Sequence, residues 1–122
     1  MTILIVEDEA ITVMLMKVII KELGHTVQNA VATGEEAIRI VDTLKPDLII
    51  MDILLAGEMN GIETAAEIRK KSDIPIVYAT GYDDCDVKEK AMKTYPIGYL
   101  IKPLSQSDFE KIFDLYHATY RN

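Results

Sequence analysis

Side chains that can carry chemistry stand at the ends of four short apolar segments of this chain. Segments 3–6 and 48–51 are followed by carboxylates, segment 74–79 by a hydroxyl group and segment 97–101 by an ammonium group. These side chains are Glu7, Asp8, Asp52, Thr80 and Lys102. Short, wholly apolar runs are typical of parallel strands that helices cover on both faces. Because the carboxyl ends of such strands share one edge of an open α/β sheet, where ligands bind, we expect the five side chains to form one site.

Three carboxylates brought together in this way would repel one another and raise a pKa unless a cation joined them. A hard divalent ion, Mg²⁺ or alternatively Mn²⁺, relieves the repulsion with one or two carboxylates, a backbone carbonyl and several waters. Glu7, Asp8 and Asp52 are therefore candidate metal ligands. The competing interpretation is that they are scattered, solvated residues at strand ends, which is the ordinary explanation for any one of them alone.

The hydroxyl and ammonium groups extend this hypothesis to phosphoryl transfer. The metal and Lys102 would neutralise the equatorial phosphoryl oxygens while Asp52 attacks in line. Taken singly, Lys102 before Pro103 is a surface residue at a turn, and Thr80 is a half-buried strand residue. Their shared position at the rim favours the chemical interpretation.

The elements that must position these side chains alternate between strand and helix five times. Strands are predicted at about 2–7, 26–31, 48–51, 74–79 and 97–101, and the second of them is expected at an edge. Helices are predicted at about 9–23, from the capping box 33–36 to Pro46, from 61 to about 71, at about 84–93, and after the cap 105–108. This alternation predicts a parallel sheet with right-handed crossovers and helices on both faces.

Two helices show which side chains should share a face. In the first, Ile11, Met14, Val18 and Leu23 lie roughly on one face, and Gly24 is suited to the position just after the helix. In the last, the side chains predicted to point inward are Phe109, Ile112, Phe113 and Tyr116.

Length and composition narrow the class of protein. The 122 residues are expected to form one domain, and the 49% hydrophobic and 27% charged content is that of an ordinary globular protein. Thirteen basic against twenty acidic residues give a net charge of −7, which argues against nucleic-acid binding. We see no apolar run of membrane-spanning length and no signal peptide. The single cysteine, Cys85, excludes an internal disulfide and suits a reducing cytoplasm, so we expect a cytoplasmic protein.

The order of these motifs resembles that of the response-regulator receiver domains of two-component signalling. The motifs are Ile5-Val6-Glu7-Asp8, Met51-Asp52, Ala79-Thr80-Gly81 and Lys102-Pro103, and the likeness extends over residues 1–122. The resemblance implies a flavodoxin-like (CheY-like) fold, a single-domain (βα)5 doubly wound parallel five-stranded sheet with strand order 2-1-3-4-5.

The resemblance also assigns roles to the site residues. Asp52 matches the phosphoacceptor, and Glu7 and Asp8 match the acidic pair that holds Mg²⁺ together with the backbone carbonyl of Leu54. Lys102 matches the lysine that pairs with the phosphoryl group. Thr80 and Tyr99 match the switch residues; simple packing at a sheet edge is the alternative for Tyr99.

The loop after the phosphoacceptor departs from the usual family pattern. Leu55-Ala56-Gly57-Glu58 replaces a Met-Pro segment, and Gly61 comes nine residues after Asp52 instead of eight. The loop 53–60 is therefore one residue longer and lacks the stiffening proline.

Three other functions remain to be weighed against a phosphorylation switch. An aspartyl phosphatase would need an acid two residues after its nucleophile, where this chain has Leu54. A flavodoxin-like cofactor binder would need a Ser/Thr/Gly-rich phosphate loop, whereas Glu7-Asp8-Glu9 would repel a phosphate. A metal-buffering or scaffolding domain would fail to become phosphorylated.

The prediction is therefore a switch rather than a turnover enzyme. A sensor histidine kinase or phosphotransfer protein would phosphorylate Asp52, and the surface around the fourth helix, fifth strand and fifth helix would change for an unidentified output protein or domain. A phosphorylation-dependent dimer is left open, and no membrane or nucleic-acid contact is expected. Leu54 and Tyr82 are expected to hinder water at the phosphoryl group; side chains that point to solvent are the alternative.

Overall fold

The structure, a computed structural model that describes residues 1–120, alternates strands and helices as predicted. The strands are β1 (Thr2–Val6), β2 (Thr26–Val31), β3 (Leu48–Met51), β4 (Ile76–Thr80) and β5 (Gly98–Ile101). The helices are α1 (Ala10–Glu22), α2 (Gly34–Leu44), α3 (Gly61–Arg69), α4 (Cys85–Met92) and α5 (Gln106–Tyr120). All strand pairs are parallel, and the sheet order β2-β1-β3-β4-β5 confirms the predicted topology, with β2 at an edge.

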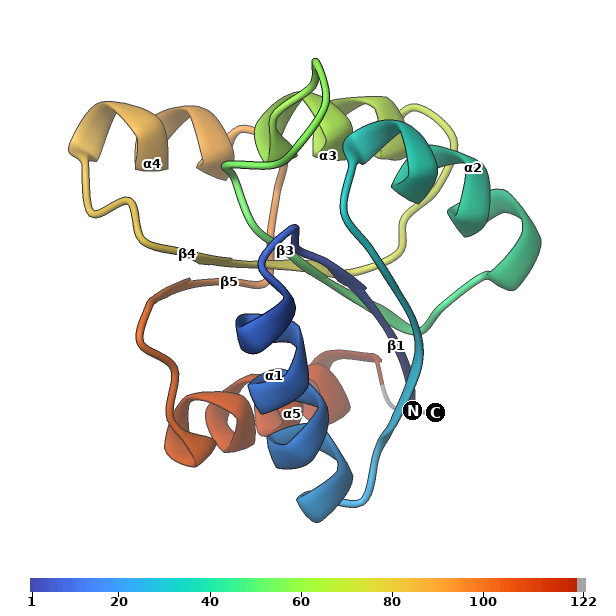
Figure 1. The fold of residues 1–122 in the computed structure, drawn as a ribbon, viewed down its shortest axis with the longest axis vertical. Helices are drawn as coiled ribbons and strands as arrows, with labels where there is room; N and C mark the ends of the chain where they lie inside the picture. The colour runs from blue at the N-terminus through green and yellow to red at the C-terminus, as the bar shows by residue number, and fades with distance from the viewer. Residues whose placement is uncertain (121–122) are drawn as a thin grey trace.

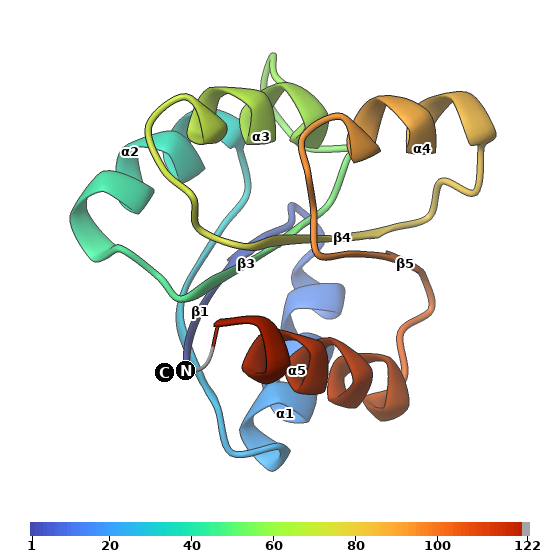
Figure 2. The ribbon, with the colours of Figure 1, turned by 180° about the vertical axis from the view of Figure 1, so that it is seen from behind.

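Helices cover both faces of the sheet. Figures 1 and 2 show α2, α3 and α4 on one face and α1 and α5 on the other. A separate apolar core lies on each side. The central strands β1, β3 and β4 belong to both cores, and this explains why their sequences are apolar without alternation.

Two strands begin slightly later than predicted. The carbonyl of Pro75 accepts a hydrogen bond from the Ile49 N–H at 2.9 Å, but Pro75 has no N–H to donate, and β4 begins at Ile76. The N–H of Ile97 reaches the carbonyl of Ile76, and β5 begins at the next residue. The carboxyl ends, which carry the candidate site, agree with the prediction to within one residue.

Side-chain caps fix where four of the helices start. Thr33 accepts from the Glu36 N–H at 3.1 Å, as predicted for α2, and Asp108 and Ser105 exchange bonds at the start of α5. Asp84 caps α4, and Asn60 forms a complete capping box with Glu63 at the start of α3. Each cap satisfies N–H groups that would otherwise lack partners, and this fixes the residue at which the helix begins.

The apolar face predicted for α1 is wrong for most of its residues. Ile11 is 78% exposed, and Met14 and Val18 are also exposed, whereas Met16 and Ile20 are buried against the sheet. Leu23 packs with the buried set. Because α1 is apolar on most of its circumference, periodicity could not decide which stripe faces the sheet. In α5 the prediction holds for Phe109, Ile112 and Phe113, and Tyr116 is half-buried against the same core.

Within residues 1–120 no helix is both long and apolar enough to span a membrane.

Candidate functional site

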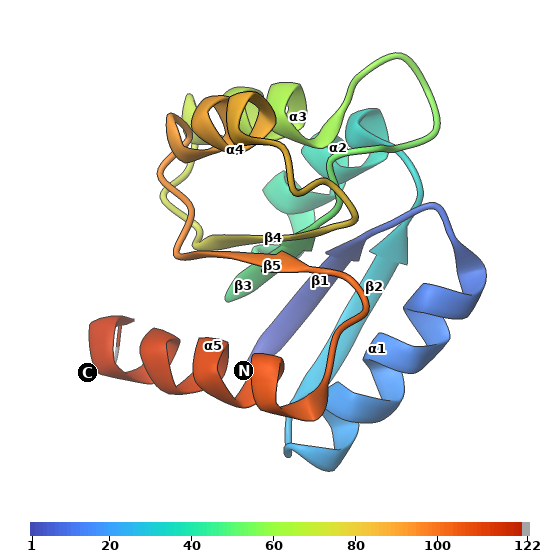
Figure 3. The same cartoon turned by 90° about the vertical axis from the view of Figure 1, so that its left-hand side faces the viewer.

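The carboxyl ends of the strands gather at one edge of the sheet, where the loops after them lie together (Figure 3). The strand register places the site residues side by side. Val6 is paired with Met51, so Glu7 and Asp52, which follow them, lie side by side. Thr80 is paired with Ile101, so Lys102 lies next to the end of β4. The Asp52 N–H bonds to the Val6 carbonyl at 2.9 Å, and the Lys102 N–H bonds to the Thr80 carbonyl at 2.8 Å. Backbone hydrogen bonds of the sheet thus fix the positions of Asp52 and Lys102 directly.

A cavity of about 400 Å³ opens at this edge. Its lining contains every residue predicted to bind the metal or phosphoryl group: Glu7, Asp8, Glu9, Asp52, Leu54, Thr80, Gly81, Tyr82 and Lys102. The carboxyl groups of Glu7 and Asp52 are buried at its floor, whereas Asp8 is exposed at its mouth. Glu9, which we had not singled out, contributes its N–H, donated to Glu7 Oε2 at 3.2 Å.

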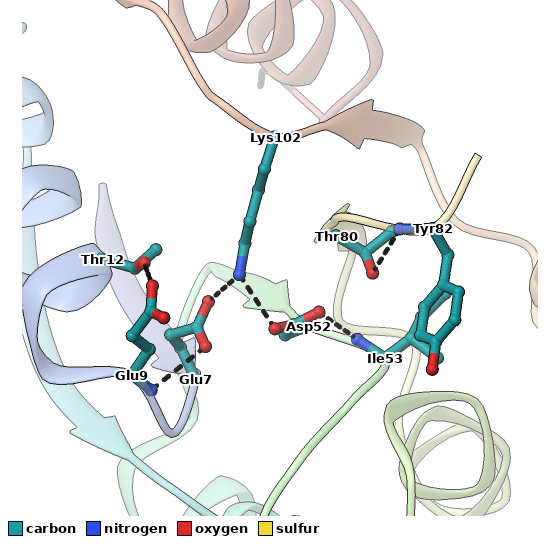
Figure 4. A network of polar contacts seen from close by, with 8 residues as sticks. All are labelled: Glu7, Glu9, Thr12, Asp52, Ile53, Thr80, Tyr82 and Lys102. Carbon is teal, nitrogen blue, oxygen red and sulfur yellow. Dashed lines mark hydrogen bonds and ion pairs between the residues drawn. The ribbon is translucent and has the colours of Figure 1, made fainter.

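The ammonium group of Lys102 lies between the two buried carboxylates (Figure 4). Its Nζ donates to Asp52 Oδ2 at 2.9 Å and to Glu7 Oε1. The other Asp52 oxygen, Oδ1, accepts from the Ile53 N–H at 2.7 Å. Both oxygens of Asp52 are therefore oriented by donors, as a positioned nucleophile requires.

Burial and the neighbouring charges shift the pKa values of Glu7 and Lys102. Burial is the main cause that raises the pKa of Glu7 to about 7; the hydrogen bond from Lys102 opposes this, and the charge of Asp52 adds to it. Burial would lower the pKa of Lys102, but its hydrogen bonds to Glu7 and Asp52 raise it overall. Lys102 is therefore charged at neutral pH, whereas Glu7 is only partly ionised near pH 7, so that a bound cation would compete with a proton for its carboxylate.

The donor set fits a hard divalent cation. Glu7, Asp8 and Asp52 each offer a carboxylate oxygen, and these oxygens all lie within 4.8 Å of one another. Oxygen donors of this kind suit Mg²⁺ or Mn²⁺ rather than softer metals. When bound, such an ion would supply the positive charge that Lys102 alone does not provide for three carboxylates.

The switch residues predicted from the resemblance are linked through the backbone of Tyr82. The Tyr82 N–H donates to Thr80 Oγ1 at 3.3 Å (Figure 4), and the hydroxyl of Tyr99 donates to the Tyr82 carbonyl at 2.9 Å. Tyr99 is half-buried and lies outside the cavity lining, with Lys88 Nζ 5.5 Å from its ring centre. Sequence reasoning did not indicate this connection, because it depends on main-chain atoms of a loop.

Leu54 and Tyr82 lie at the cavity, and both are exposed to solvent. Their exposed fractions are 62% and 39%. Exposure is compatible both with control of water entry and with the alternative that they serve only partner contacts.

The longer loop 53–60 has a defined course. Its residues Ile53 and Leu55 are buried, Ala56 pairs with Thr33, and Gly57 turns the chain at φ +88°. The loop closes where the Gly61 N–H donates to the Ile53 carbonyl at 2.7 Å. The loop is thus anchored at several points although it lacks the proline.

Gly61, which sequence reasoning used only to measure the length of the loop, packs against the backbone of the candidate site. A methyl group at this position would lie 1.9 Å from the backbone oxygen of Asp52 and 2.9 Å from the Cα of Ile53. The start of α3 therefore packs directly against the backbone that carries Asp52. The glycine itself is visible in the sequence, but the close approach is not.

Comparisons with known proteins agree with this geometry. The sequence pattern of the response regulator receiver domain matches residues 3–114. The transcriptional regulatory protein PdtaR of Mycobacterium tuberculosis is 34% identical over 98% of this chain and 58% of its own length. A positive alginate biosynthesis regulatory protein of Pseudomonas aeruginosa is 31% identical over 88% of this chain and 44% of its length. The chain thus spans about half the length of these curated relatives.

Solved structures show the same fold. The signal receiver domain of a modulated diguanylate cyclase from Desulfovibrio desulfuricans has a TM-score of 0.87 at 31% identity, over 94% of this chain and 91% of that one. The N-terminal domain of a response regulator/sensory box/GGDEF protein from Carboxydothermus hydrogenoformans has a TM-score of 0.87 at 32% identity, over 98% and 96% of the two chains. This chain belongs to the response regulator receiver domain family.

Proposed function

We propose that this domain is a phosphorylation switch that accepts a phosphoryl group on Asp52. The observation that carries the proposal is the environment of this carboxylate. Asp52 is buried at the floor of an open cavity, with Lys102 on one oxygen and two further carboxylates within reach of a shared cation. Response regulator receiver domains act as signalling switches rather than turnover enzymes.

The transfer can be written from these groups. A carboxylate oxygen of Asp52 attacks the phosphorus of a phosphohistidine in line, the P–N bond breaks, and the leaving imidazole keeps the bond's electron pair. Lys102 is already within hydrogen-bond distance of Asp52 and would pair with the phosphoryl oxygens. Glu7, Asp8 and the Leu54 carbonyl would hold Mg²⁺, with Mn²⁺ as an alternative.

The acyl phosphate should then persist long enough to signal. No acid or amide stands two residues after Asp52, where Leu54 lies, so the chain offers no general base for an attacking water there. This feature supports a switch over an aspartyl phosphatase.

The output step would begin at Thr80. Movement of its hydroxyl toward the phosphoryl group would remove the acceptor of the Tyr82 N–H, and Tyr99 is bonded to the same residue. The surface formed by α4, β5 and α5 would change as a result. The donor would be a sensor histidine kinase or phosphotransfer protein in the cytoplasm. The relative PdtaR is named a transcriptional regulatory protein, which supports an output domain or protein that controls transcription.

The proposal is tested by incubation with acetyl phosphate or phosphoramidate and Mg²⁺, followed by intact mass measurement. One phosphoryl group should be gained by the wild type and lost on hydroxylamine treatment, which cleaves acyl phosphates. Asp52→Asn or removal of the metal should abolish the gain, and Asp83→Asn, an exposed carboxylate on a neighbouring loop, should not. Undiminished labelling of Asp52→Asn would refute the assignment, and no labelling of the wild type would favour a scaffolding domain.

A further inference from the structure

The two ends of α4 are attached to the rest of the domain very differently. Figures 1 and 2 show the C-terminal end of α4 beside α3, while its N-terminal end lies at the outer edge of the molecule. Ala91, near the C-terminal end, is fully buried, and Thr94, just after the helix, is buried as well. At the other end, residues 81–86 are all exposed.

A buried hydroxyl pair fixes the C-terminal end. Tyr78 on β4 has no exposed surface, and its hydroxyl lies 2.6 Å from Thr94 Oγ1. Thr94 donates its only hydroxyl proton to the Ala91 carbonyl at 2.6 Å, so Tyr78 must be the donor to Thr94. Burial raises the pKa of Tyr78, and the hydroxyl therefore keeps its proton at neutral pH. The chain of bonds runs from the sheet into the last turn of α4.

Arg69 ties the same point to α3. Its Nε donates to the Thr94 carbonyl at 3.0 Å, and its Nη1 donates to the Ile74 carbonyl. The Thr94 N–H is also used, because it donates to the Ala91 carbonyl at 3.0 Å. Every polar group of Thr94 is thus bonded within a buried region, where losing a partner is costly.

Within residues 1–120, no buried side-chain network of this kind holds the N-terminal end of α4; Tyr82, just before it, is bonded through its backbone only to Thr80 and Tyr99, the predicted switch residues. Its cap is local: Asp84 accepts from the N–H groups of Asp86 and Val87, which belong to the helix itself. From this half of α4, the half-buried Val87 packs against the core, and Lys88 lies over the ring of Tyr99. Local free energies of opening are therefore expected to be lower here than at residues 91–94.

Tyr78 also touches the predicted switch residue. Tyr78 and Tyr99 are register partners on β4 and β5, and their ring centres are 6.0 Å apart. The hydroxyl bond to Thr94 holds the Tyr78 ring still, so that this ring is a fixed surface against which Tyr99 rests.

We propose that the Tyr78–Thr94–Arg69 network makes α4 a lever, pinned at its C-terminal end and free at its N-terminal end. Signals that move Tyr99 then displace residues 82–88, while residues 91–95 stay in place. Tyr78 is a positioning residue in this scheme, since it acts through Thr94 and Tyr99. The signal-dependent part rests on the proposed function, whereas the pinned end is a property of the unphosphorylated domain.

Amide hydrogen exchange tests both parts. In the unphosphorylated wild type, the amides of 91–95 that are hydrogen-bonded should exchange more slowly than those of 82–88. With Mg²⁺ and beryllofluoride, a phosphoryl mimic, exchange should change at 82–88 and stay constant at 91–95. Equal changes at both ends would overturn the lever, as would equally fast exchange at both ends in the unphosphorylated protein.

Single substitutions test whether the Tyr78–Thr94 bond itself, rather than the fold in general, holds the C-terminal end of α4. Tyr78→Phe and Thr94→Val remove one hydroxyl each and should speed exchange at 91–95 by about 5- to 10-fold, the equivalent of one lost hydrogen bond. Thr94→Ser should restore slow exchange, and Tyr95→Phe, whose side chain is 81% exposed beside the network, should change nothing. Unaltered exchange in Tyr78→Phe and Thr94→Val would refute the pin. If instead the variants behave as expected but beryllofluoride changes exchange nowhere in the domain, the lever and the proposed function fail and the pinned end stands.

Discussion

Replacement of Gly61 by alanine should disturb Asp52, the proposed phosphoacceptor, more than the separation of the two residues in sequence suggests. The added methyl would lie 1.9 Å from the backbone oxygen of Asp52, and real contacts of this kind stay above 3.0 Å, so the two segments must separate by at least 1.1 Å. Three backbone atoms of Asp52 and Ile53 crowd the position, and no flexible side chain can yield instead. The start of α3 and the segment that carries Asp52 must therefore move apart.

The size of the effect follows from that displacement. Overpacking a tight region typically costs about 1–3 kcal/mol, and a backbone clash belongs at the upper end of this range. Because α3 is anchored by its capping box, part of the strain should fall on Asp52. A misplacement of about 1 Å in a reacting group can lower a rate roughly 10²-fold. We therefore expect a loss of stability of about 3 kcal/mol together with a roughly 10²-fold loss of phosphorylation rate.

The assay pairs urea denaturation with the initial rate of phosphorylation by phosphoramidate at saturating Mg²⁺. Gly81→Ala is a matched control at the same rim, since a methyl there meets nothing within 4 Å and the residue is exposed. It should alter the free energy of unfolding by less than about 0.5 kcal/mol. A Gly61→Ala protein as stable and as reactive as Gly81→Ala would refute the claim that α3 packs on the phosphoacceptor backbone.

Four further predictions concern charge and timing. The pKa of Glu7 is about 7 in the folded protein and 4.5 ordinarily, so the free energy of unfolding without metal should fall as pH rises from 4.5 through 7. The affinity for Mg²⁺ should rise over the same pH range. Glu7→Gln should abolish both trends, measured by denaturation and by metal titration. Asp8→Asn should weaken Mg²⁺ binding more than Glu7→Gln, and millimolar Mg²⁺ should raise the wild-type melting temperature; an unchanged melting temperature would contradict the metal site. Decay of the acyl phosphate should be faster in Leu54→Asn and Tyr82→Ala than in the wild type, whereas equal lifetimes would remove both residues from the timing. Burial, the nearby amino terminus and His117 lower the pKa of His25 below 6.5, so stability should drop as pH falls through this region, and His25→Gln should reduce the drop seen by thermal melting.

Much of the fold followed from local patterns in the sequence. Apolar runs bounded by Gly, Pro and capping residues predicted the five strands and five helices now seen in residues 1–120, because strand burial on both faces and helix capping are short-range properties. The likeness to receiver domains supplied the strand order. The candidate site followed for the same reason: Glu7, Asp52 and Lys102 stand next to strand ends, and parallel strands bring their ends to one edge.

Tertiary structure alone decided features that depend on distant segments. The exposed stripe of α1 that contains Ile11 is as apolar as the buried stripe, so only packing on the sheet could choose between them. The pairing of Lys102 with Glu7, a residue 95 positions away, needs the folded rim. The contact of Gly61 with the Asp52 backbone and the Tyr78–Thr94 bond likewise join elements across the fold. A sequence records which groups are present, but their distances and partners are fixed only when the helices dock on the sheet.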